Sequence, residues 1–262
     1  MEIKYENKYI AFLDVLGFSA LVEKKDQEKL EIYFFLIDEA FKAFDSKIKH
    51  VTKLIISDSI ILTANDTDEN FLDLITAISA LQATLAVSGI WIRGGVSFGE
   101  VFCDDKRNII VGKGYIKAYL LEQQAIYPRV IIDPVILSKM NVNRQEFYKK
   151  YNSHTYVTPL KSKKVHDYDF DKHKRYTQDD AIFICYANLA IVHALKRLGN
   201  KDLEQTYHCV KHGLYGEQKH YHKYLWLRKY FLECLEEFDS YTDTESPNKP
   251  VLKKYIEDFT AL

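Results

Sequence analysis

The sequence lacks a long hydrophobic run, low-complexity segments and a strong charge of either sign. No stretch stays apolar over the roughly 18 residues that a membrane-spanning helix requires, so we expect no association with a membrane. Only 10 glycines and 5 prolines occur in 262 residues, and 47% of the residues are hydrophobic, which is typical of a folded domain. The net charge of −1 gives no field that attracts nucleic acid, so a small ligand or a protein partner is expected.

Cysteine pairs and a targeting segment are also missing. The 4 cysteines lie far apart and form no C-x-x-C pair, which argues against a structural zinc site and against a disulfide framework. We expect reduced and mostly buried thiols. Residues 1–8 contain no apolar signal core, and we therefore expect the protein to remain in the cytoplasm.

The hydrophobic pattern predicts one α+β domain with a helical C-terminal extension. A chain of this length can bury a full core, and we place the domain at residues 1–186 and the extension at 187–262. Apolar residues recur at helical spacing in three segments of the first part, and short β-branched or aromatic runs lie between them. The expected helices are 27–48, 69–87 and 112–124, and the expected strands are 9–14, 51–63 as a hairpin, 90–102, 127–133 and 181–186.

A lone carboxylate, Asp14, ends the first apolar run. The run reads Tyr-Ile-Ala-Phe-Leu-Asp-Val-Leu-Gly over residues 9–17, so a strand gives way to a turn directly after Asp14. A carboxylate in this place is suited to bind a metal ion. It is equally suited to cap a helix that begins near Gly17, and the residues alone leave both interpretations open.

A second lone carboxylate, Asp58, lies within Ser-Asp-Ser between two β-branched runs. The pattern predicts a tight hairpin with Asp58 at its tip. An aspartate is common in turns because its side chain can bond to its own backbone. The alternative is that Asp58 forms a metal site together with Asp14.

The strand over residues 90–102 carries three glycines. These glycines allow another group to approach the backbone of the strand. We also predict a bulge at Gly94 and Gly95, and a hairpin turn at Gly99 that leads into a returning strand.

Taken together, these motifs resemble the catalytic domain of class III nucleotide cyclases. Residues 12–18, Phe-Leu-Asp-Val-Leu-Gly-Phe, look like the first metal motif of that family, and residues 56–58, Ile-Ser-Asp, look like the second. Residues 93–101, Arg-Gly-Gly-Val-Ser-Phe-Gly-Glu-Val, look like its glycine-containing hairpin, and residues 112 and 118–122 follow its dimer-helix pattern. The match covers about residues 8–186 in the order and at the separations of the family.

The resemblance implies a ferredoxin-like palm domain that binds a nucleoside triphosphate with two divalent metal ions, Mn²⁺ or Mg²⁺. Asp14 and Asp58 would be the metal ligands, together with the carbonyl oxygen of Val15. The other expected nucleotide-binding residues of the first motif are Phe12, Gly17 and Phe18.

At several positions the residue differs from the one that purine cyclases have. Leu54 and Ile109 occupy the positions of the lysine and aspartate that read adenine, so a purine base would lack its usual hydrogen-bond partners. Ile116 and Leu120 replace the asparagine and the transition-state arginine of the dimer helix. Charge on the triphosphate must then be met elsewhere, and we expect this of Arg93, Arg129 and Arg175, the last at the end of a basic loop.

These departures resemble the Pycsar pyrimidine cyclases of bacterial antiphage defence. The further matching segments are Tyr-Pro-Arg at 127–129, Asp-Asp at 179–180 and His-Lys-Tyr-Leu-Trp-Leu at 222–227, whereas Ala181 stands where a glycine is usual. The resemblance implies synthesis of cyclic UMP or cyclic CMP, with UTP preferred over CTP. It also implies a homodimer with active sites at the interface, and a separate effector that responds to the cyclic nucleotide.

Three other interpretations remain open. The chain is a purine cyclase with an unusual base pocket, a catalytically silent cyclase-fold module that binds nucleotide, or an α/β domain in which both aspartates only support turns.

Overall fold

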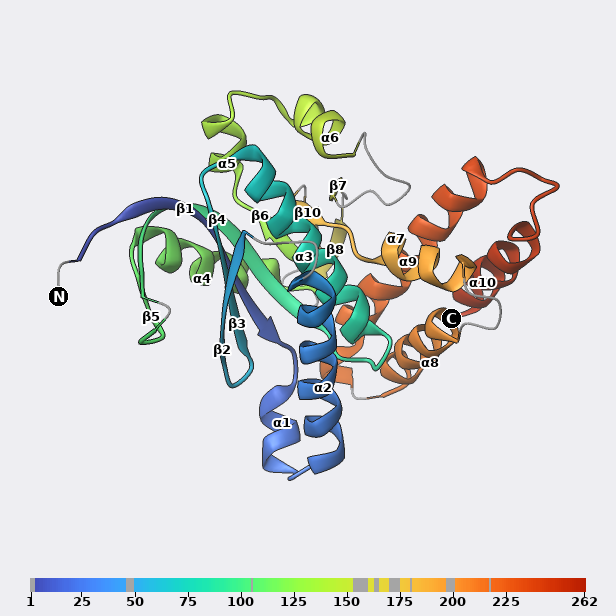
Figure 1. Ribbon diagram of the computed structural model, residues 1–262. Coiled ribbons are helices and arrows are strands. Elements are labelled where there is room, and N and C mark those ends of the chain that lie inside the picture. Colours follow the sequence, from blue (N-terminus) through green and yellow to red (C-terminus); the bar gives the residue numbers. More distant parts are fainter. Residues whose placement is uncertain are drawn as a thin grey trace.

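A computed structural model describes residues 3–45, 50–104, 106–152, 160–162, 165–169, 175–179, 181–196, 201–216 and 218–262. Within these residues the main sheet has the strand order β2-β3-β1-β4-β6-β10-β7, and β5 pairs with the outer part of β4 (Figure 1). Its strands are β1 (Glu6–Val15), β2 (Val51–Ile56), β3 (Ser59–Asn65), β4 (Ile92–Asp104), β5 (Ile109–Val111), β6 (Val130–Ile132), β7 (Leu160–Ser162) and β10 (Ile182–Ile184). A separate ribbon pairs β8 (Val165–Asp169) with β9 (Arg175–Asp179).

The first four strands form a ferredoxin-like core. Helices α1 (Phe18–Glu23) and α2 (Gln27–Asp45) connect β1 to β2, and α3 (Asp68–Ala86) connects β3 to β4. The order β4-β1-β3-β2, with every neighbouring pair antiparallel, is that of a β-α-β-β-α-β unit. The predicted α+β class and the two long predicted helices are therefore confirmed.

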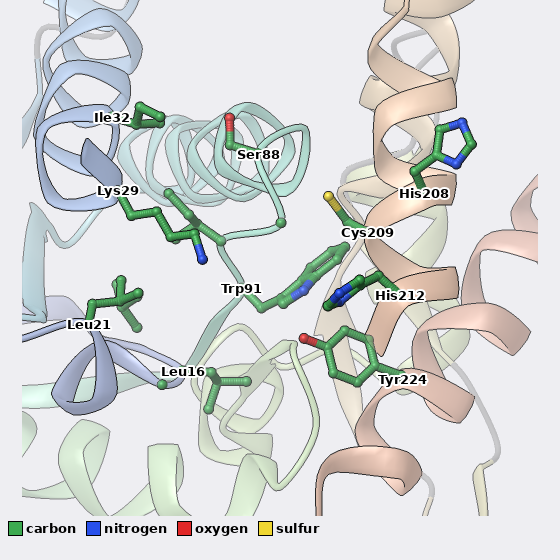
Figure 2. A pocket seen from close by; sticks show the side chains of 14 residues that line it. Leu16, Leu21, Lys29, Ile32, Ser88, Trp91, His208, Cys209, His212 and Tyr224 are labelled. Atoms are coloured by element: carbon green, nitrogen blue, oxygen red, sulfur yellow. The ribbon is translucent and has the colours of Figure 1, made fainter. Parts of the chain in front are cut away.

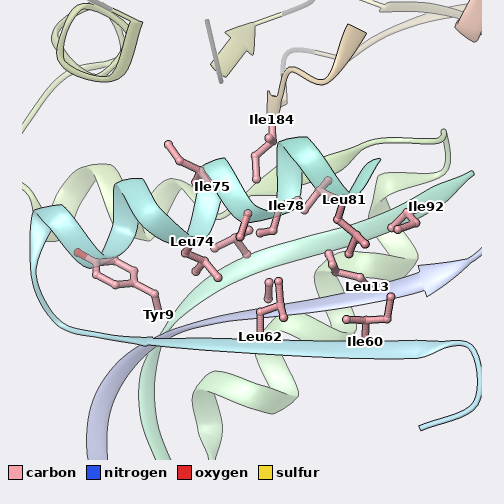
Figure 3. Close-up of a cluster of buried hydrophobic side chains, with 14 of the residues drawn as sticks. Tyr9, Leu13, Ile60, Leu62, Leu74, Ile75, Ile78, Leu81, Ile92 and Ile184 are labelled. Atoms are coloured by element: carbon pink, nitrogen blue, oxygen red, sulfur yellow. The ribbon is translucent and has the colours of Figure 1, made fainter. Parts of the chain in front are cut away.

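Side-chain alternation along β1 separates the two faces of the sheet. Tyr9 and Leu13 point toward α2 and α3 and lie in a core with Leu74 and Ile78 (Figure 3). Ile10 and Phe12 point to the other face, where α4 (Lys113–Ala125) packs on them through Ala118. Asp14 follows the same alternation, so its side chain lies on the α4 face.

A helical C-terminal region, also predicted, follows the sheet (Figure 1). Its helices form a second core with Ile131 of β6 and Phe183 of β10. Its elements are α7 (Ala187–Lys196), α8 (Asp202–Leu214), η1 (Gln218–His220), α9 (Tyr221–Tyr241) and α10 (Lys249–Ala261). The hydroxyl of Tyr230 on α9 accepts hydrogen bonds from the backbone N–H groups of Tyr186 and Ala187, at 2.8 and 3.0 Å. This contact ties α9 to the end of the sheet. The boundary between residues 186 and 187 stays a prediction.

Two short helices, α5 (Pro134–Lys139) and α6 (Arg144–Asn152), follow β6. Asp133 caps α5, since its carboxylate accepts the N–H of Val135 at 3.0 Å. No helix in the described part of the chain combines the length and the hydropathy needed to cross a membrane. All four cysteines are free thiols, two buried and two half-buried.

The predicted glycine bulge and the hairpin turn at Gly99 are wrong. Gly94 and Gly95 pair in regular register with Leu13 and Phe12, and β4 runs without interruption through Gly99 to Asp104. Gly95 and Gly99 instead permit close packing of α4, whereas a Cβ at Gly94 would lie 2.6 Å from the carbonyl oxygen of Phe12 on β1. A Cβ at Gly95 would lie 2.4 Å from the Cβ of Leu121, and one at Gly99 would lie 3.2 Å from the Cα of Gly114.

We expect Gly95→Ala to destabilise the fold by about 1 to 3 kcal/mol or more, because the added methyl group forces α4 away from β4. Urea unfolding followed by circular dichroism measures this change. Gln124→Ala, on the exposed side of the same helix, is the control and should change stability by no more than about 0.5 kcal/mol. Equal stability of the Gly95→Ala variant and the wild type would contradict the packing argument.

Candidate active site

Asp14 lies at the end of β1, between two neighbouring strands that both carry polar groups. Its Cα pairs with Ser59 of β3 on one side and with Arg93 of β4 on the other. A quarter of its side chain is exposed. The helix that follows begins at Phe18 with Gly17 as its N-cap, and no side chain caps it. The helix-capping interpretation of Asp14 is therefore wrong.

Asp58 lies at the tip of the β2–β3 hairpin, as predicted. Ile56 pairs with Ser59, and Ser57 takes a positive φ of 59° to make the two-residue turn. The N–H of Val15 donates to the carbonyl oxygen of Asp58 at 3.2 Å, which joins the turn directly to the end of β1. The sheet thus brings together the two aspartates that lie 44 positions apart in the sequence.

An ion pair closes the site on the side of α4. The guanidinium of Arg93 pairs with the carboxylate of Glu122, of which only 5% is exposed, and lies 3.6 Å from Asp14. Arg93 projects from the same face of β4 as Gly95, on which Leu121 of α4 packs. The close approach of α4 therefore positions Glu122.

The electrostatics of this cluster disfavour the ionised form of Asp14. Burial, followed by the carboxylates of Glu122 and Asp58, raises the pKa of Asp14 to about 6, although Arg93 and Lys223 act in the opposite direction. Burial and the same two aspartates also raise the pKa of Tyr33, whose hydroxyl donates to the carbonyl oxygen of Ser57 at 3.4 Å. Excess negative charge at Asp14 favours binding of a cation.

The donor set fits ions that keep part of their coordination for other ligands. No group of three or more acidic, histidine or cysteine side chains gathers in metal-binding geometry among the described residues. Mg²⁺ characteristically uses one or two carboxylates together with water and substrate phosphates. Asp14 and Asp58 meet that requirement, and the carbonyl of Val15 as a further ligand stays a prediction.

The other residues of the first motif have different environments. Phe12 and Phe18 are each only 6% exposed. Phe12 packs edge-on against Tyr119, and Phe18 packs edge-on against Tyr33, with ring centroids 5.2 and 5.3 Å apart. Gly17 has φ of 81°, and a Cβ there would meet no atom within 4 Å. The turn at Gly17 is thus open to a ligand, whereas both rings belong to the core.

The three arginines that we expected to contact the triphosphate lie in three different parts of the fold. Arg93 lies beside Asp14. Arg129 is completely buried among the rings of Tyr127, Phe183 and Trp226, and its Nε donates to the carbonyl oxygen of Ala125 at 3.1 Å. Arg175 is the first residue of β9, and its side chain lies outside what the structure describes. Roles of these residues in binding a triphosphate stay predictions.

Leu54 and Ile109, the positions that depart from purine cyclases, line one small hollow of about 20 Å³ between β2 and β5. Thr52 and Thr63 line it too, and their hydroxyl groups lie 2.8 Å apart in a hydrogen bond. Asp104, at the edge, is held by Arg107, whose Nε donates to it at 2.8 Å.

The sequence interpretation missed Glu122 and Lys223 as members of the site. Glu122 was part of the dimer-helix pattern, and a buried acid one position after the apolar Leu121 was the available signal. Lys223 is half-buried on α9, and no local motif connects residue 223 with residue 14. The contact depends on how the C-terminal helices fold back on the sheet.

No protein-family model matches the chain, and no curated protein matches it. Solved structures that resemble it include the adenylyl cyclase CyaB from P. aeruginosa, at 15% identity and a TM-score of 0.44, over 70% of this chain and 96% of that one. Another is the guanylate cyclase domain of RhGC from Catenaria anguillulae in complex with GTP, at 15% identity and a TM-score of 0.44, over 69% and 96%. A third is the catalytic core of a rhodopsin-guanylyl cyclase with converted specificity in complex with ATPalphaS. Its identity is 16% and its TM-score is 0.46, and the match covers 70% of this chain and 98% of that one.

Asp14→Asn should stabilise the metal-free protein at neutral and alkaline pH. Because the native pKa of about 6 lies above the ordinary value of 3.8, ionisation of Asp14 costs stability as pH rises through this interval. After allowance for solvent screening, we expect a gain of about 1 to 2 kcal/mol at pH 8 that shrinks toward zero near pH 4.

Urea unfolding in the presence of a chelator, at both pH values, measures the gain. Asp38→Asn, an exposed position on α2, is the control and should show no such dependence. A gain of equal size at pH 4 and pH 8 would contradict the electrostatic explanation.

Proposed function

We propose that this protein is a metal-dependent nucleotide cyclase that converts a pyrimidine nucleoside triphosphate, UTP in preference to CTP, into the 3′,5′-cyclic monophosphate and pyrophosphate. The observation that carries the proposal is the juxtaposition of Asp14 and Asp58 at one end of the sheet, linked by the Val15–Asp58 hydrogen bond of 3.2 Å. The motif resemblance of residues 12–18, 56–58 and 93–101 adds to it.

In the reaction, the ribose 3′-oxygen loses its proton and attacks the α-phosphorus in line with the leaving group. The bond from the α-phosphorus to the bridging oxygen breaks, and pyrophosphate leaves with the electron pair. Two divalent ions at Asp14 and Asp58 would lower the pKa of the 3′-hydroxyl and neutralise charge on the phosphates. The chain itself supplies position and charge: the two carboxylates, the open turn at Gly17, and Arg93 held in place by Glu122.

The residue types at positions 54 and 109 favour a pyrimidine over a purine. The two apolar side chains leave purine edge atoms without hydrogen-bond partners, which disfavours ATP and GTP.

An apolar exposed face of α4 supports a homodimer. Ile116, Tyr119 and Leu120 are each between 43% and 56% exposed, and Val111 and Ile56 are exposed nearby. In such a dimer, the metal-binding residues of one subunit would face the Leu54–Ile109 hollow of the other. By the resemblance to the Pycsar pyrimidine cyclases, the product would act in the cytoplasm as a second messenger of antiphage defence and would activate a separate effector.

A silent nucleotide-binding module is the second candidate, because α4 presents Ile116 and Leu120 where an active purine cyclase has polar groups. Calorimetry that detects nucleotide binding without product formation would favour it.

The substrate test is incubation with each of the four ribonucleoside triphosphates and Mn²⁺ or Mg²⁺, followed by chromatography of the products. We expect a cyclic product from UTP and less from CTP, and no turnover in the presence of a chelator. Cyclic product from ATP or GTP alone would refute the pyrimidine assignment. Absence of a cyclic product from all four would refute the enzyme assignment.

Asp14→Ala and Asp58→Ala should each lower turnover by at least about a hundredfold, since each removes a direct metal ligand, and should leave the circular dichroism spectrum unchanged. Asp38→Ala is the matched control and should retain full activity. Near-normal turnover in either active-site variant would remove that aspartate from the mechanism.

A further inference from the structure

The C-terminal helix α9 lies next to the turn that follows Asp14. Lys223, in its first turn, lines a cavity of about 110 Å³ together with Leu16, Gly17 and Pro128. Leu16, Trp91 and Tyr224 also line a larger cavity of about 480 Å³. Figure 2 shows this larger cavity. Open space therefore separates the turn from α9, and a ligand at the turn can reach the side chain of Lys223.

Lys223 is a half-buried cation whose charge is not consumed by an ion pair. Its charge interacts with Asp14 and Glu122, which places it near the acidic cluster, and it also interacts with Arg93. Within the described residues it makes no ion pair and no side-chain hydrogen bond. The charge of Arg93, by contrast, is already engaged by Glu122 and lies 3.6 Å from Asp14.

Other described positions are less suited to meet the phosphates, and Lys29, which lines the larger cavity, pairs with Asp26 at 3.4 Å. Ile116 and Leu120 on α4 carry no charge, and Arg129 has no exposed surface in the second core. An ammonium group on a flexible stem can bind phosphate oxygens as a point charge. Gly17, where no atom lies within 4 Å of a Cβ position, leaves room for a phosphate chain beside Lys223.

We propose that Lys223 of α9 binds the phosphate chain of the substrate, so that the helical C-terminal region completes the active site. This inference rests on the proposed function, because it names the cation that meets the charge of the triphosphate at that same site. It also predicts that inorganic tripolyphosphate binds at the same place without a base or a ribose.

The experiment compares the full-length wild type with Lys223→Gln and Lys223→Met, which remove the charge, and with Lys223→Arg, which retains it. Steady-state kinetics with the active nucleotide gives KM, and calorimetry with tripolyphosphate in the presence of Mg²⁺ gives the Kd for tripolyphosphate. We expect both neutral variants to raise KM and the Kd for tripolyphosphate by about tenfold, which corresponds to the loss of one exposed charge-assisted contact. Lys223→Arg should remain within about threefold of the wild type.

Lys229→Gln, at an exposed position of the same helix, is the matched control and should leave both constants unchanged. Thermal melting of each variant identifies any loss of structure, and the Lys223→Met variant retains the apolar stem that is buried. Unchanged tripolyphosphate affinity in both neutral variants would overturn the proposal, as would an equal loss in Lys223→Arg. If the wild type forms no cyclic product, the proposed function fails, whereas the tripolyphosphate measurement still tests Lys223.

Discussion

The close approach of α4 to β4 at Gly95 is the constraint on which the site depends. With no side chain at Gly95, Leu121 packs directly on the strand, and the next residue, Glu122, reaches Arg93. Arg93 in turn lies 3.6 Å from Asp14 on the neighbouring strand. The contact between α4 and β4 at Gly95 thereby determines how the carboxylate of Glu122, the guanidinium of Arg93 and the carboxylate of Asp14 lie relative to one another.

This arrangement concentrates negative charge around Asp14. In the protein without a bound metal ion, the nearby cations neutralise this charge only in part. Three carboxylates, Asp14, Asp58 and Glu122, share the region with Arg93 and Lys223. Burial, followed by the carboxylates of Glu122 and Asp58, raises the pKa of Asp14 to about 6. Such a cluster costs stability in the absence of a cation and favours its binding, a common relation between stability and function at active sites. The partial burial of Asp14 strengthens both effects, because charges interact more strongly away from water.

Local patterns predicted the elements and the two aspartates, since strand alternation, helical spacing and a two-residue hairpin are properties of short segments. The close approach of another element to the glycines of β4 was predicted correctly, but the bulge at Gly94 and Gly95 and the turn at Gly99 were predicted wrongly. A glycine within a strand looks the same in the sequence whether it makes a bulge, a turn or room for a helix, and only the packing of Leu121 and Gly114 distinguishes these cases. Residues 222–227 were noted as a matching segment, but the position of Lys223 near Asp14 was not predictable, because it depends on contacts between residues about 200 positions apart.

Arg129 and Lys223 illustrate how tertiary packing gives two cations different environments that their local sequence does not reveal. Arg129 follows a tyrosine and a proline before β6, a plausible place for a phosphate contact, yet its guanidinium lies among Tyr127, Phe183 and Trp226. Trp226 also stacks on Tyr127, with ring centroids 5.5 Å apart and an angle of 9° between the rings. These contacts attach α9 to the sheet one helical turn beyond Lys223. The buried arginine therefore helps to position the helix that brings the lysine to the site.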